Sequence, residues 1–404
     1  MSATDLELLR RYEPVVRYTQ GELFLPMGAD EYLAHAALHR TRRDRKGEEV
    51  LAEAGTITPD RLAELGREHD QDSLYLQYVE KPLSRKDFRS WRQDPDRPRF
   101  TASSRFASVG LLSRLIDTTM RLTLLLRGRV PGGYAAAAHQ QVGRQAAYVY
   151  HGHVLRDAGY VVLQYWYLYA MNDWRSTFGG VNDHEADWEQ VTLFLVDHGP
   201  DADPEPAWVA FSSHDEVGDD LRRRWDDPDI TFVGGTHPVV YAGAGSHSGA
   251  YLPGEYVIGV GLPIPGPIDR LRRAVMRVLP WGDGEDAAIG IPYIDYRRGD
   301  GVAIGPMQER SWSPVLVTDD THWVRDFRGL WGLDTRDPLG GERAPAGPRY
   351  DRDGSVRESW RQPVAWAGLD KEAPTDTSAL DDLRSLRHHL EAERLELEPR
   401  LEEA

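Results

Sequence analysis

The sequence predicts a mainly β protein, an antiparallel β-sandwich core with helices added before and after it. Five short runs rich in β-branched and aromatic residues, each bounded by turn residues, support this prediction. They cover residues 160–170, 188–196, 207–213, 238–245 and 256–262. Because successive runs have no helix between them, antiparallel sheets packed face to face are favoured over a parallel α/β sheet. We expect the sandwich to span about 160–331.

The residues before these runs predict a short extended segment followed by helices. Residues 12–25 are extended up to a break at Pro26. Helical patterns then cover 58–66, 107–127 and 134–154, with a charged surface loop at 88–100. In the first helix Thr58 is the expected N-cap and Pro59 takes the first helical position. We therefore predict a single domain, residues 1–344, with a helical insertion at about 40–155.

The C-terminal part predicts a linker and a final helix. A helical pattern at 267–279 interrupts the strands. Residues 345–376 are rich in proline and charge, which predicts a linker or a segment wrapped on the surface. Residues 377–404 contain a helix in which Leu383, Leu390 and Leu397 are seven apart. That spacing fits a short coiled-coil seam, but packing of so short a stripe onto the parent domain is the interpretation we favour.

Composition argues against several classes of protein. The 404 residues carry a formal charge of −17, which disfavours nucleic-acid binding because phosphate contacts need a basic surface. The absence of cysteine excludes disulfides, thiolate metal sites and cysteine nucleophiles. The most apolar helical pattern, 111–126, contains three charged residues and is shorter than the roughly 20 residues of a membrane span. Since the N-terminus is charged and unlike a signal peptide, we expect a cytoplasmic protein that does not span a membrane.

The segment 172–195 joins a cluster of acids to a strongly apolar strand. Asp187 and Glu189 share the alternation of the apolar residues that follow them at 191, 193 and 195. Both carboxylates are therefore predicted to point toward a buried face. An ionised carboxylate in such a place needs a cationic partner, since leaving it unpaired costs several kcal/mol.

Two interpretations of this cluster remain open. In the first, Asp173 and His184 join Asp187 and Glu189 around a divalent cation. Three carboxylates with one imidazole suit Mg²⁺ or Ca²⁺ better than Mn²⁺ or Zn²⁺. In the second, the acids form a structural ion-pair network with Arg175, the nearest cation in the sequence.

Two further histidines are candidate catalytic residues. His214 ends a predicted strand and could serve as a general base, although an exposed turn is the simpler interpretation. His247 lies among small residues that allow a ligand to approach the backbone, and a plain turn explains it equally well. His151 and His153 have the spacing of a metal pair, but two histidines alone are a weak signal. No serine lies in a Gly-x-Ser-x-Gly sequence, which disfavours a serine hydrolase.

The heptapeptide Asp-His-Glu-Ala-Asp-Trp-Glu at 183–189 resembles Gly-His-Arg-His-Asp-Trp-Glu of the necrosis-inducing, NPP1-like proteins, and the His-x-x-Asp-Trp-Glu segment of Vps62-like proteins. His-Pro-Val-Val-Tyr at 237–241, leading into Gly-Ser-His at 245–247, is similar to a Vps62-like stretch. Gly-Leu-Trp-Gly at 329–332 resembles that family's Gly-x-Trp-Gly. The resemblance covers 12–26 weakly and 160–333 more firmly, and Vps62-like proteins are the better fit.

This resemblance implies a central β-sandwich and a divalent cation held by acids and a histidine. By position the ligands would be His184, Asp187 and Glu189, together with Asp173 across a loop that is longer than in the family. NPP1-like toxins use this site to engage sphingolipid headgroups of plant membranes. Ala186 departs from the heptapeptide's second histidine, and the chain has no cysteine pair, so a secreted toxin is not the expected role.

Two classes of function are therefore predicted. The first is a non-catalytic binding module, whose cation holds an anionic or sugar headgroup of a small molecule or of a lipid at a membrane surface, and whose helices contact a protein partner. The second is a metal-dependent hydrolase of ester or phosphoester bonds, with His214 or His247 moving the proton. The binding module is the function we favour.

Overall fold

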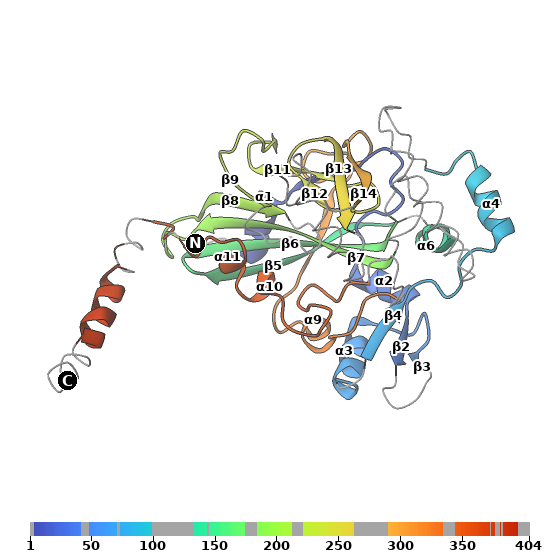
Figure 1. The fold of residues 1–404 in the computed structure, drawn as a ribbon, viewed down its shortest axis with the longest axis horizontal. Helices are drawn as coiled ribbons and strands as arrows, with labels where there is room; N and C mark the ends of the chain where they lie inside the picture. Colours follow the sequence, from blue (N-terminus) through green and yellow to red (C-terminus); the bar gives the residue numbers. More distant parts are fainter. Residues whose placement is uncertain are drawn as a thin grey trace, which may run out of the picture.

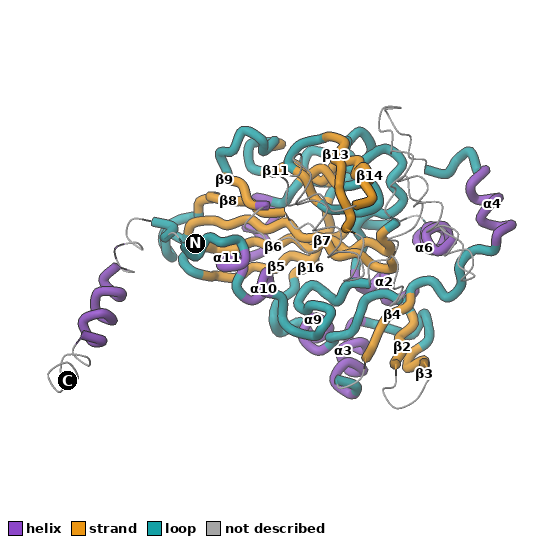
Figure 2. Tube along the Cα trace, in the orientation of Figure 1, coloured by secondary structure: helices purple, strands orange, loops and turns teal. Residues whose placement is uncertain are grey.

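The computed structural model describes residues 4–41, 48–70, 73–98, 133–143, 145–173, 184–211, 221–261, 290–333, 344–371, 373–375, 380 and 383–394. For 257–261 and 290–294 it describes the backbone alone. Within these residues the strands form sheets of six, five, three and two strands (Figures 1 and 2). The described chain is strand-rich with several antiparallel sheets, as the sequence predicts.

The six-stranded sheet forms the centre of the structure, in the order β16-β5-β6-β7-β8-β9. Its strands are β5 (Tyr148–Asp157), β6 (Tyr160–Asn172), β7 (His184–Val196), β8 (Glu205–Phe211), β9 (Arg222–Arg224) and β16 (Trp312–Leu316). Strands β5 to β9 pair antiparallel, whereas β16 pairs parallel with β5. Nearly every residue of β6 and β7 is buried. Burial on both faces explains the almost continuous apolar and aromatic sequence of β6, whereas the first half of β7 is polar.

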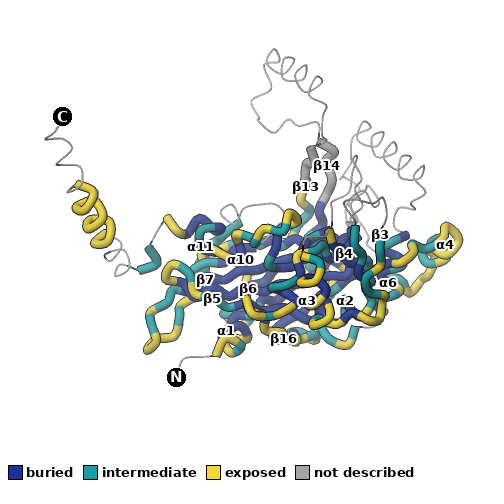
Figure 3. The backbone as a smooth tube through the Cα atoms, turned by 90° about the horizontal axis from the view of Figure 1, so that it is seen from below, coloured by how far each residue is buried: buried dark blue, intermediate teal, exposed yellow. Residues whose placement is uncertain are grey.

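A five-stranded sheet contacts the central sheet. It contains β1 (Val15–Arg17), β10 (Phe232–Val233), β11 (His237–Ala242), β12 (Gly249–Ala250) and β15 (Ala303–Ile304), with β1 parallel to β11. Tyr18, just after β1, forms a 2.9 Å hydroxyl–hydroxyl hydrogen bond with Tyr169 on β6. Val16 and Val240 join Leu193 of β7 in one apolar cluster. The hairpin of β13 (Gly254–Gly261) and β14 (Gly290–Arg297) projects from the body (Figure 3).

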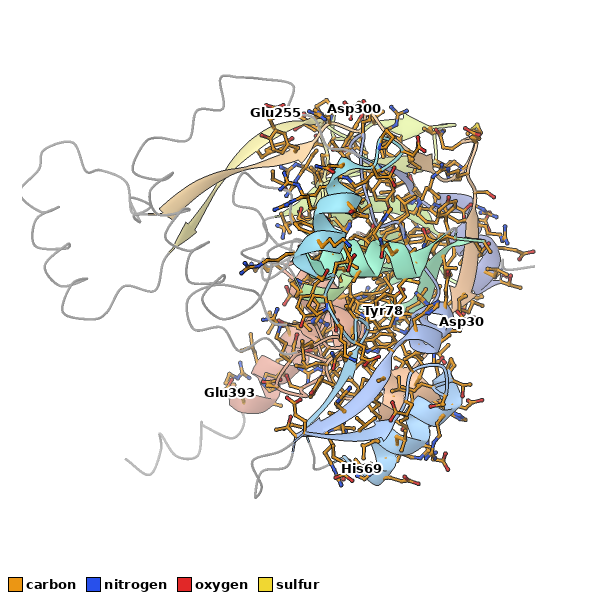
Figure 4. The ribbon with its side chains drawn as sticks, turned by 90° about the vertical axis from the view of Figure 1, so that its right-hand side faces the viewer. Asp30, His69, Tyr78, Glu255, Asp300 and Glu393 are labelled. Carbon is orange, nitrogen blue, oxygen red and sulfur yellow. The ribbon has the colours of Figure 1, made fainter. Side chains whose placement is uncertain are left out.

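Further helices and a small sheet complete the described fold. They are α2 (Ala29–His35), α9 (His322–Asp326), α10 (Glu358–Arg361), α11 (Pro363–Trp366), α3 (Pro59–Glu68) and the sheet of β2 (Ala37–Thr41), β3 (Glu48–Ala52) and β4 (Ser73–Gln77). His153 of β5 stacks on Trp360, with ring centroids 3.9 Å apart, and Trp188 of β7 packs against Trp323. In Figure 4, His69 lies at the end of the molecule opposite to Glu255 and Asp300.

The predicted helical insertion at about 40–155 contains strands as well as helices. The region contains α3, α4 (Arg85–Gln93) and α6 (Gly133–Val142), but also β3, β4 and most of β5. The predicted helix at 134–154 stops at Val142 because only its first half is rich in alanine. The alternating aromatic and β-branched residues from Tyr148 onward favour a strand instead. The predicted N-cap is confirmed, since the Thr58 hydroxyl accepts from the Arg61 backbone N–H.

Two further local predictions hold only in part. The predicted extended segment 12–25 contains only the three-residue strand β1, and a helix, α1 (Asp5–Tyr12), precedes it. A capping box in which Thr4 and Glu7 bond each other's backbone starts this helix, a signal visible in the sequence. Part of the predicted loop 88–100 belongs to α4, which Ser84 caps. The helical patterns at 107–127 and 267–279 lie outside the described residues.

The C-terminal part contains a buried segment and an exposed helix. Trp360, Val364 and Leu369 are buried against the body, which agrees with a segment wrapped on the surface rather than a free linker. Residues 383–394 form a helix in which every residue is exposed. The favoured packing of its leucines onto the parent domain is therefore wrong for this described stretch. No helix among the residues described is both long and apolar enough to cross a membrane.

Candidate functional site

The candidate site lies at the C-terminal end of β6 and the N-terminal end of β7, next to the loop 243–248. Asp187 and Glu189 pair across the ladder with Tyr169 and Tyr167. Both carboxylates are buried, and they alternate along β7 in step with the core residues Val191 and Leu193. The predicted burial of two acids at the start of this strand is therefore confirmed.

His247 is the cation that the structure places against Asp187. Its Nδ1 lies 2.8 Å from an Asp187 carboxylate oxygen, and its Nε2 lies 3.7 Å from a carboxylate oxygen of Glu22. The imidazole stacks almost parallel on Tyr169, with ring centroids 3.8 Å apart. Burial alone would lower the pKa of His247, but the hydrogen bonds and charges of Asp187 and Glu22 raise it to about 10. His247 is therefore an imidazolium at neutral pH.

Glu22 is a member of the site that sequence reasoning missed. One carboxylate oxygen accepts from the backbone N–H groups of Leu23 and Phe24, and the other accepts from Gly245 at 2.9 Å. These bonds tie the segment after β1 to the loop that carries His247. Glu22 and Gly245 are 223 positions apart, so no local pattern in the sequence reports their contact.

Two residues with a left-handed backbone conformation adjoin the hydrogen bond between Asp187 and His247. Ala186, the preceding residue, has a φ of +57°, and so does His247. Non-glycine residues in this region cost roughly 1–3 kcal/mol each and persist where surrounding contacts enforce them, often at functional sites. Two such residues around one carboxylate therefore support a functional role for this part of β7.

An arginine and an aspartate hold the His247 loop in place. Arg297 on β14 donates from Nε to Asp295 at 2.6 Å and from a terminal nitrogen to the Ser248 hydroxyl at 2.8 Å. The other terminal nitrogen donates to the Gly249 carbonyl at 3.1 Å. Asp295 and Ser248 are buried. This clamp fixes the chain on the C-terminal side of His247, and sequence reasoning missed it because the two segments are far apart in the chain.

Gly245 is the point at which three parts of the site meet. It has a φ of +74°, its N–H donates to Glu22 and its carbonyl accepts from the Asp173 N–H at 3.1 Å. A Cβ at this position would press on the Asp173 carbonyl and lie 2.8 Å from a carboxylate oxygen of Asp173. Asp173 is thus placed beside the loop, and only glycine fits the contact.

Gly245→Ala is expected to lower the free energy of unfolding by about 1–3 kcal/mol, through overpacking added to the cost of a positive φ. Urea denaturation of wild type and variant measures the difference. Gly235→Ala is the matched control, because Gly235 also has a positive φ of +83° but has no atom within 4 Å of the place that a Cβ would take. Equal losses in the two variants would contradict the close packing at Gly245.

His184 and Asn172 complete the polar surroundings of Asp187. His184 is buried, and its Nδ1 lies 2.7 Å from the Ala186 carbonyl, so Nδ1 carries the proton and Nε2 carries the lone pair in the neutral ring. The Asn172 amide nitrogen donates to Asp187 at 3.2 Å. The Asn172 amide oxygen is buried and has no hydrogen-bond partner within the described part of the chain. An unsatisfied buried oxygen therefore lies beside the carboxylate.

Glu185, which sequence reasoning passed over, turns to a different part of the molecule. It accepts from the backbone N–H groups of Tyr78, Val79 and Leu333 at 2.8–3.0 Å. Burial raises the pKa of Glu185 to about 7, although the three donors favour its ionised form. This side chain fastens β7 to the end of β4 and to the segment after Trp331.

The predicted ligand set is brought together only in part. Asp187 is joined to His247, and Asp173 lies beside the same loop, but across the described ranges no three histidines, aspartates or glutamates lie close enough together to hold a metal ion. The convergence of Asp173, His184, Asp187 and Glu189 stays a prediction. His214 and Arg175 lie outside the described residues.

The weak metal-pair signal of His151 and His153 has a structural explanation. His151 is buried and accepts from the Ala29 N–H at the start of α2, and burial lowers its pKa to about 4. His153 lies 2.9 Å from the Gln164 side-chain oxygen and stacks on Trp360. These contacts give one nitrogen of each ring a protein partner.

Comparison with known proteins gives no family assignment. No family model, no curated protein and no solved structure matches this chain. The resemblance to Vps62-like proteins stays a prediction that depends on the short motifs at 183–189, 237–247 and 329–332.

Proposed function

We propose that this chain is a divalent-cation-dependent binding protein of the Vps62-like type, in which the central and five-stranded sheets form a β-sandwich. The site around Asp187 would hold a Mg²⁺ or Ca²⁺ ion. The ion in turn would bind an anionic or sugar headgroup of a small molecule or lipid. The proposal is supported by the chemistry of the buried side chains at the end of β7.

The main observation behind this proposal is the Asn172 amide oxygen. It is buried beside Asp187 and has no hydrogen-bond partner in the described structure. Carboxylate and amide oxygens are the ligands that Mg²⁺ and Ca²⁺ prefer. A buried acceptor without a donor costs about 1–3 kcal/mol. A cation next to Asp187 would satisfy it. The residues present therefore fit a hard, oxygen-bound cation.

The protonation of His184 supports the same proposal. Histidines that bind metals usually donate their other ring N–H to a carbonyl or carboxylate, which fixes the tautomer. The bond from Nδ1 to the Ala186 carbonyl has this form, and the left-handed φ of Ala186 is part of the geometry that sets this carbonyl. The His184 ring therefore has the tautomer that metal-binding histidines usually show.

Buried acids gather at this end of the sheet. Glu22, Asp187 and Glu189 are buried there, and the charge of Glu189 acts on Tyr169. His247 supplies a positive charge among them. A cation bound to these acids would provide a positive centre for an anionic headgroup.

The geometry gives no support to His247 as a general base. Its imidazolium form has no lone pair with which to accept a proton, and both ring nitrogens face carboxylates. We therefore propose a binding role for the site rather than hydrolysis.

Added Mg²⁺ or Ca²⁺ is expected to raise the melting temperature of chelator-treated protein. A ligand at 100 times its Kd stabilises the folded state by about 2.7 kcal/mol, which is a shift of several degrees. Asp187→Asn should abolish the response, and Asn172→Leu should weaken it without removing a charge. Glu205→Gln, at an exposed position on β8, is the control that should respond like wild type. The same melting temperature with chelator and with each cation in wild type would contradict the proposal.

A further inference from the structure

Glu185 holds β7 at the point where the strand enters the candidate site. Its buried carboxylate accepts three backbone N–H groups, from Tyr78 and Val79 just after β4 and from Leu333. One carboxylate oxygen accepts from Tyr78 and Leu333, both at 3.0 Å, and the other accepts from Val79 at 2.8 Å. Tyr78 lies near the middle of the molecule in Figure 4. One side chain therefore ties β7 to two segments that are distant from it in the sequence.

The two segments that supply these donors are themselves joined. The Leu330 N–H donates to the Leu74 carbonyl at 3.0 Å, and the Leu76 N–H donates to the Leu330 carbonyl at 2.9 Å. Leu74 and Leu76 belong to β4. Strand β4 and the segment 330–333 therefore reach Glu185 as one unit.

Gly332 brings this unit against the backbone of Glu185. A Cβ at position 332 would press on the Glu185 carbonyl oxygen and would lie 2.7 Å from the carbonyl carbon and from the Cβ of the same residue. Because these distances are shorter than van der Waals contact, the approach needs glycine. The adjacent Trp331 packs edge-on against Trp188, with ring centroids 5.1 Å apart. The unit therefore contacts β7 both before and after the left-handed residue, Ala186.

The contact at the Glu185 carbonyl leads directly to the site. Nδ1 of His184 lies 3.4 Å from this carbonyl oxygen and 2.7 Å from that of Ala186. Asp187 follows the left-handed Ala186 and lies 2.8 Å from His247. A left-handed alanine is unfavourable and persists only where surrounding contacts enforce it. The contacts of Glu185 supply this constraint from the preceding residue.

We infer that Glu185 is a positioning residue for the cation site. Together with Gly332 and the three N–H donors it forms a unit that we call the β7 anchor. The anchor holds the residue before the left-handed turn, and the turn sets the tautomer of His184 and the direction of Asp187. Glu185 acts through these neighbours, because its own carboxylate faces the three donors. The inference rests on the proposed function, but the ring of His184 is measurable without a cation.

Tb³⁺, which takes oxygen ligands as Ca²⁺ does, measures the effect of the β7 anchor on cation binding. Glu185→Ala is expected to weaken Tb³⁺ binding by about 10- to 100-fold, the usual result of removing an outer partner of a metal site. Glu185→Gln keeps one acceptor oxygen and should weaken binding less. Gly332→Ala leaves every side chain of the site in place and should also weaken binding, since the added Cβ displaces the Glu185 carbonyl.

Phe194→Ala is the matched control for a loss of stability alone. Phe194 is buried near the other end of β7, in an apolar cluster with Val162 and Val364. Its truncation destabilises the fold but leaves the β7 anchor intact, so Tb³⁺ should bind as it does to wild type. An equal weakening in Phe194→Ala overturns the inference.

Nitrogen NMR of the histidine rings gives a second readout that needs no cation. At a pH where an ordinary histidine is neutral, the wild-type His184 ring should carry its proton on Nδ1, and Glu185→Ala should mix the two tautomers. His184→Gln identifies the signal. An unchanged tautomer, or an unchanged Tb³⁺ affinity, in Glu185→Ala overturns the inference.

Two further outcomes keep the test decisive. If Glu185→Ala does not fold, Glu185→Gln is judged by the same tautomer and the same affinity. A wild type that binds no Tb³⁺ contradicts the proposed function, and the His184 tautomer alone then decides whether Glu185 positions this end of β7.

Discussion

His247→Ala is expected to lower the free energy of unfolding by about 3–5 kcal/mol at pH 7, the usual cost of removing one partner of a buried ion pair. The change leaves the carboxylates of Asp187 and Glu22 facing each other without the imidazolium between them. Chemical denaturation of wild type and variant measures the loss. His247→Asn is the informative comparison, because asparagine tolerates a left-handed φ and keeps a donor for Asp187. The free energy of unfolding that this variant loses therefore reports the missing charge alone.

The pH dependence of the same interaction has a definite sign. The pKa of His247 is raised from 6.5 in its ordinary state to about 10 in the fold, so the folded protein holds a proton that the unfolded chain releases. The stabilisation is therefore complete below about pH 6.5 and is lost as the pH rises through 10. His247→Asn should lack this decline. A wild type equally stable from pH 7 to 10 would contradict the ion pair.

Glu185→Ala is expected to cost roughly 3–6 kcal/mol, because three buried N–H donors lose their acceptor at about 1–3 kcal/mol each. The donors belong to Tyr78, Val79 and Leu333, so the variant also loosens β4 from β7. Glu185→Gln keeps one acceptor oxygen and should lose less. Replacement of the exposed Glu205 by alanine should change stability by no more than about 0.5 kcal/mol.

The titration of Glu185 falls in a lower pH window than that of His247. Its pKa is raised from 4.5 to about 7, so the folded state retains a proton that the unfolded chain gives up. Its contribution is present below pH 4.5 and is lost as the pH rises through 7. The wild type should therefore lose stability between pH 4.5 and 7, and Glu185→Gln should lose less over that range. Parallel stability curves for the two proteins would contradict this assignment.

The strands were predictable because their signals are local. The alternation from Asp187 to Leu195 places both carboxylates on the buried side, and the aromatic run from Tyr160 identifies one of the two longest strands of the central sheet. The candidate site was predictable only for its members on β7 and for His247. Glu22, Asp295 and Arg297 join it through contacts across more than one sheet, and no periodic pattern encodes such contacts.

One error has a clear physical origin, a local pattern that long-range contacts override. The predicted helix at 134–154 extends beyond Val142, where pairing of β5 with β6 instead stabilises a strand. Glu185, for which no prediction was made, has the same parity as Asp187. The left-handed φ of Ala186 breaks the alternation between them, so that Glu185 reaches Tyr78 while Asp187 reaches His247.

Terbium luminescence measures cation binding at the site most directly, because Tb³⁺ takes oxygen ligands as Ca²⁺ does and is excited through nearby aromatic rings such as Tyr169. Titration of chelator-treated wild type should give a saturable signal at one ion per chain, reversed by excess Ca²⁺. Asp187→Asn should lose this signal, and Glu205→Gln should keep it. No saturable signal in wild type, or an unchanged signal in Asp187→Asn, would contradict a cation site at the end of β7.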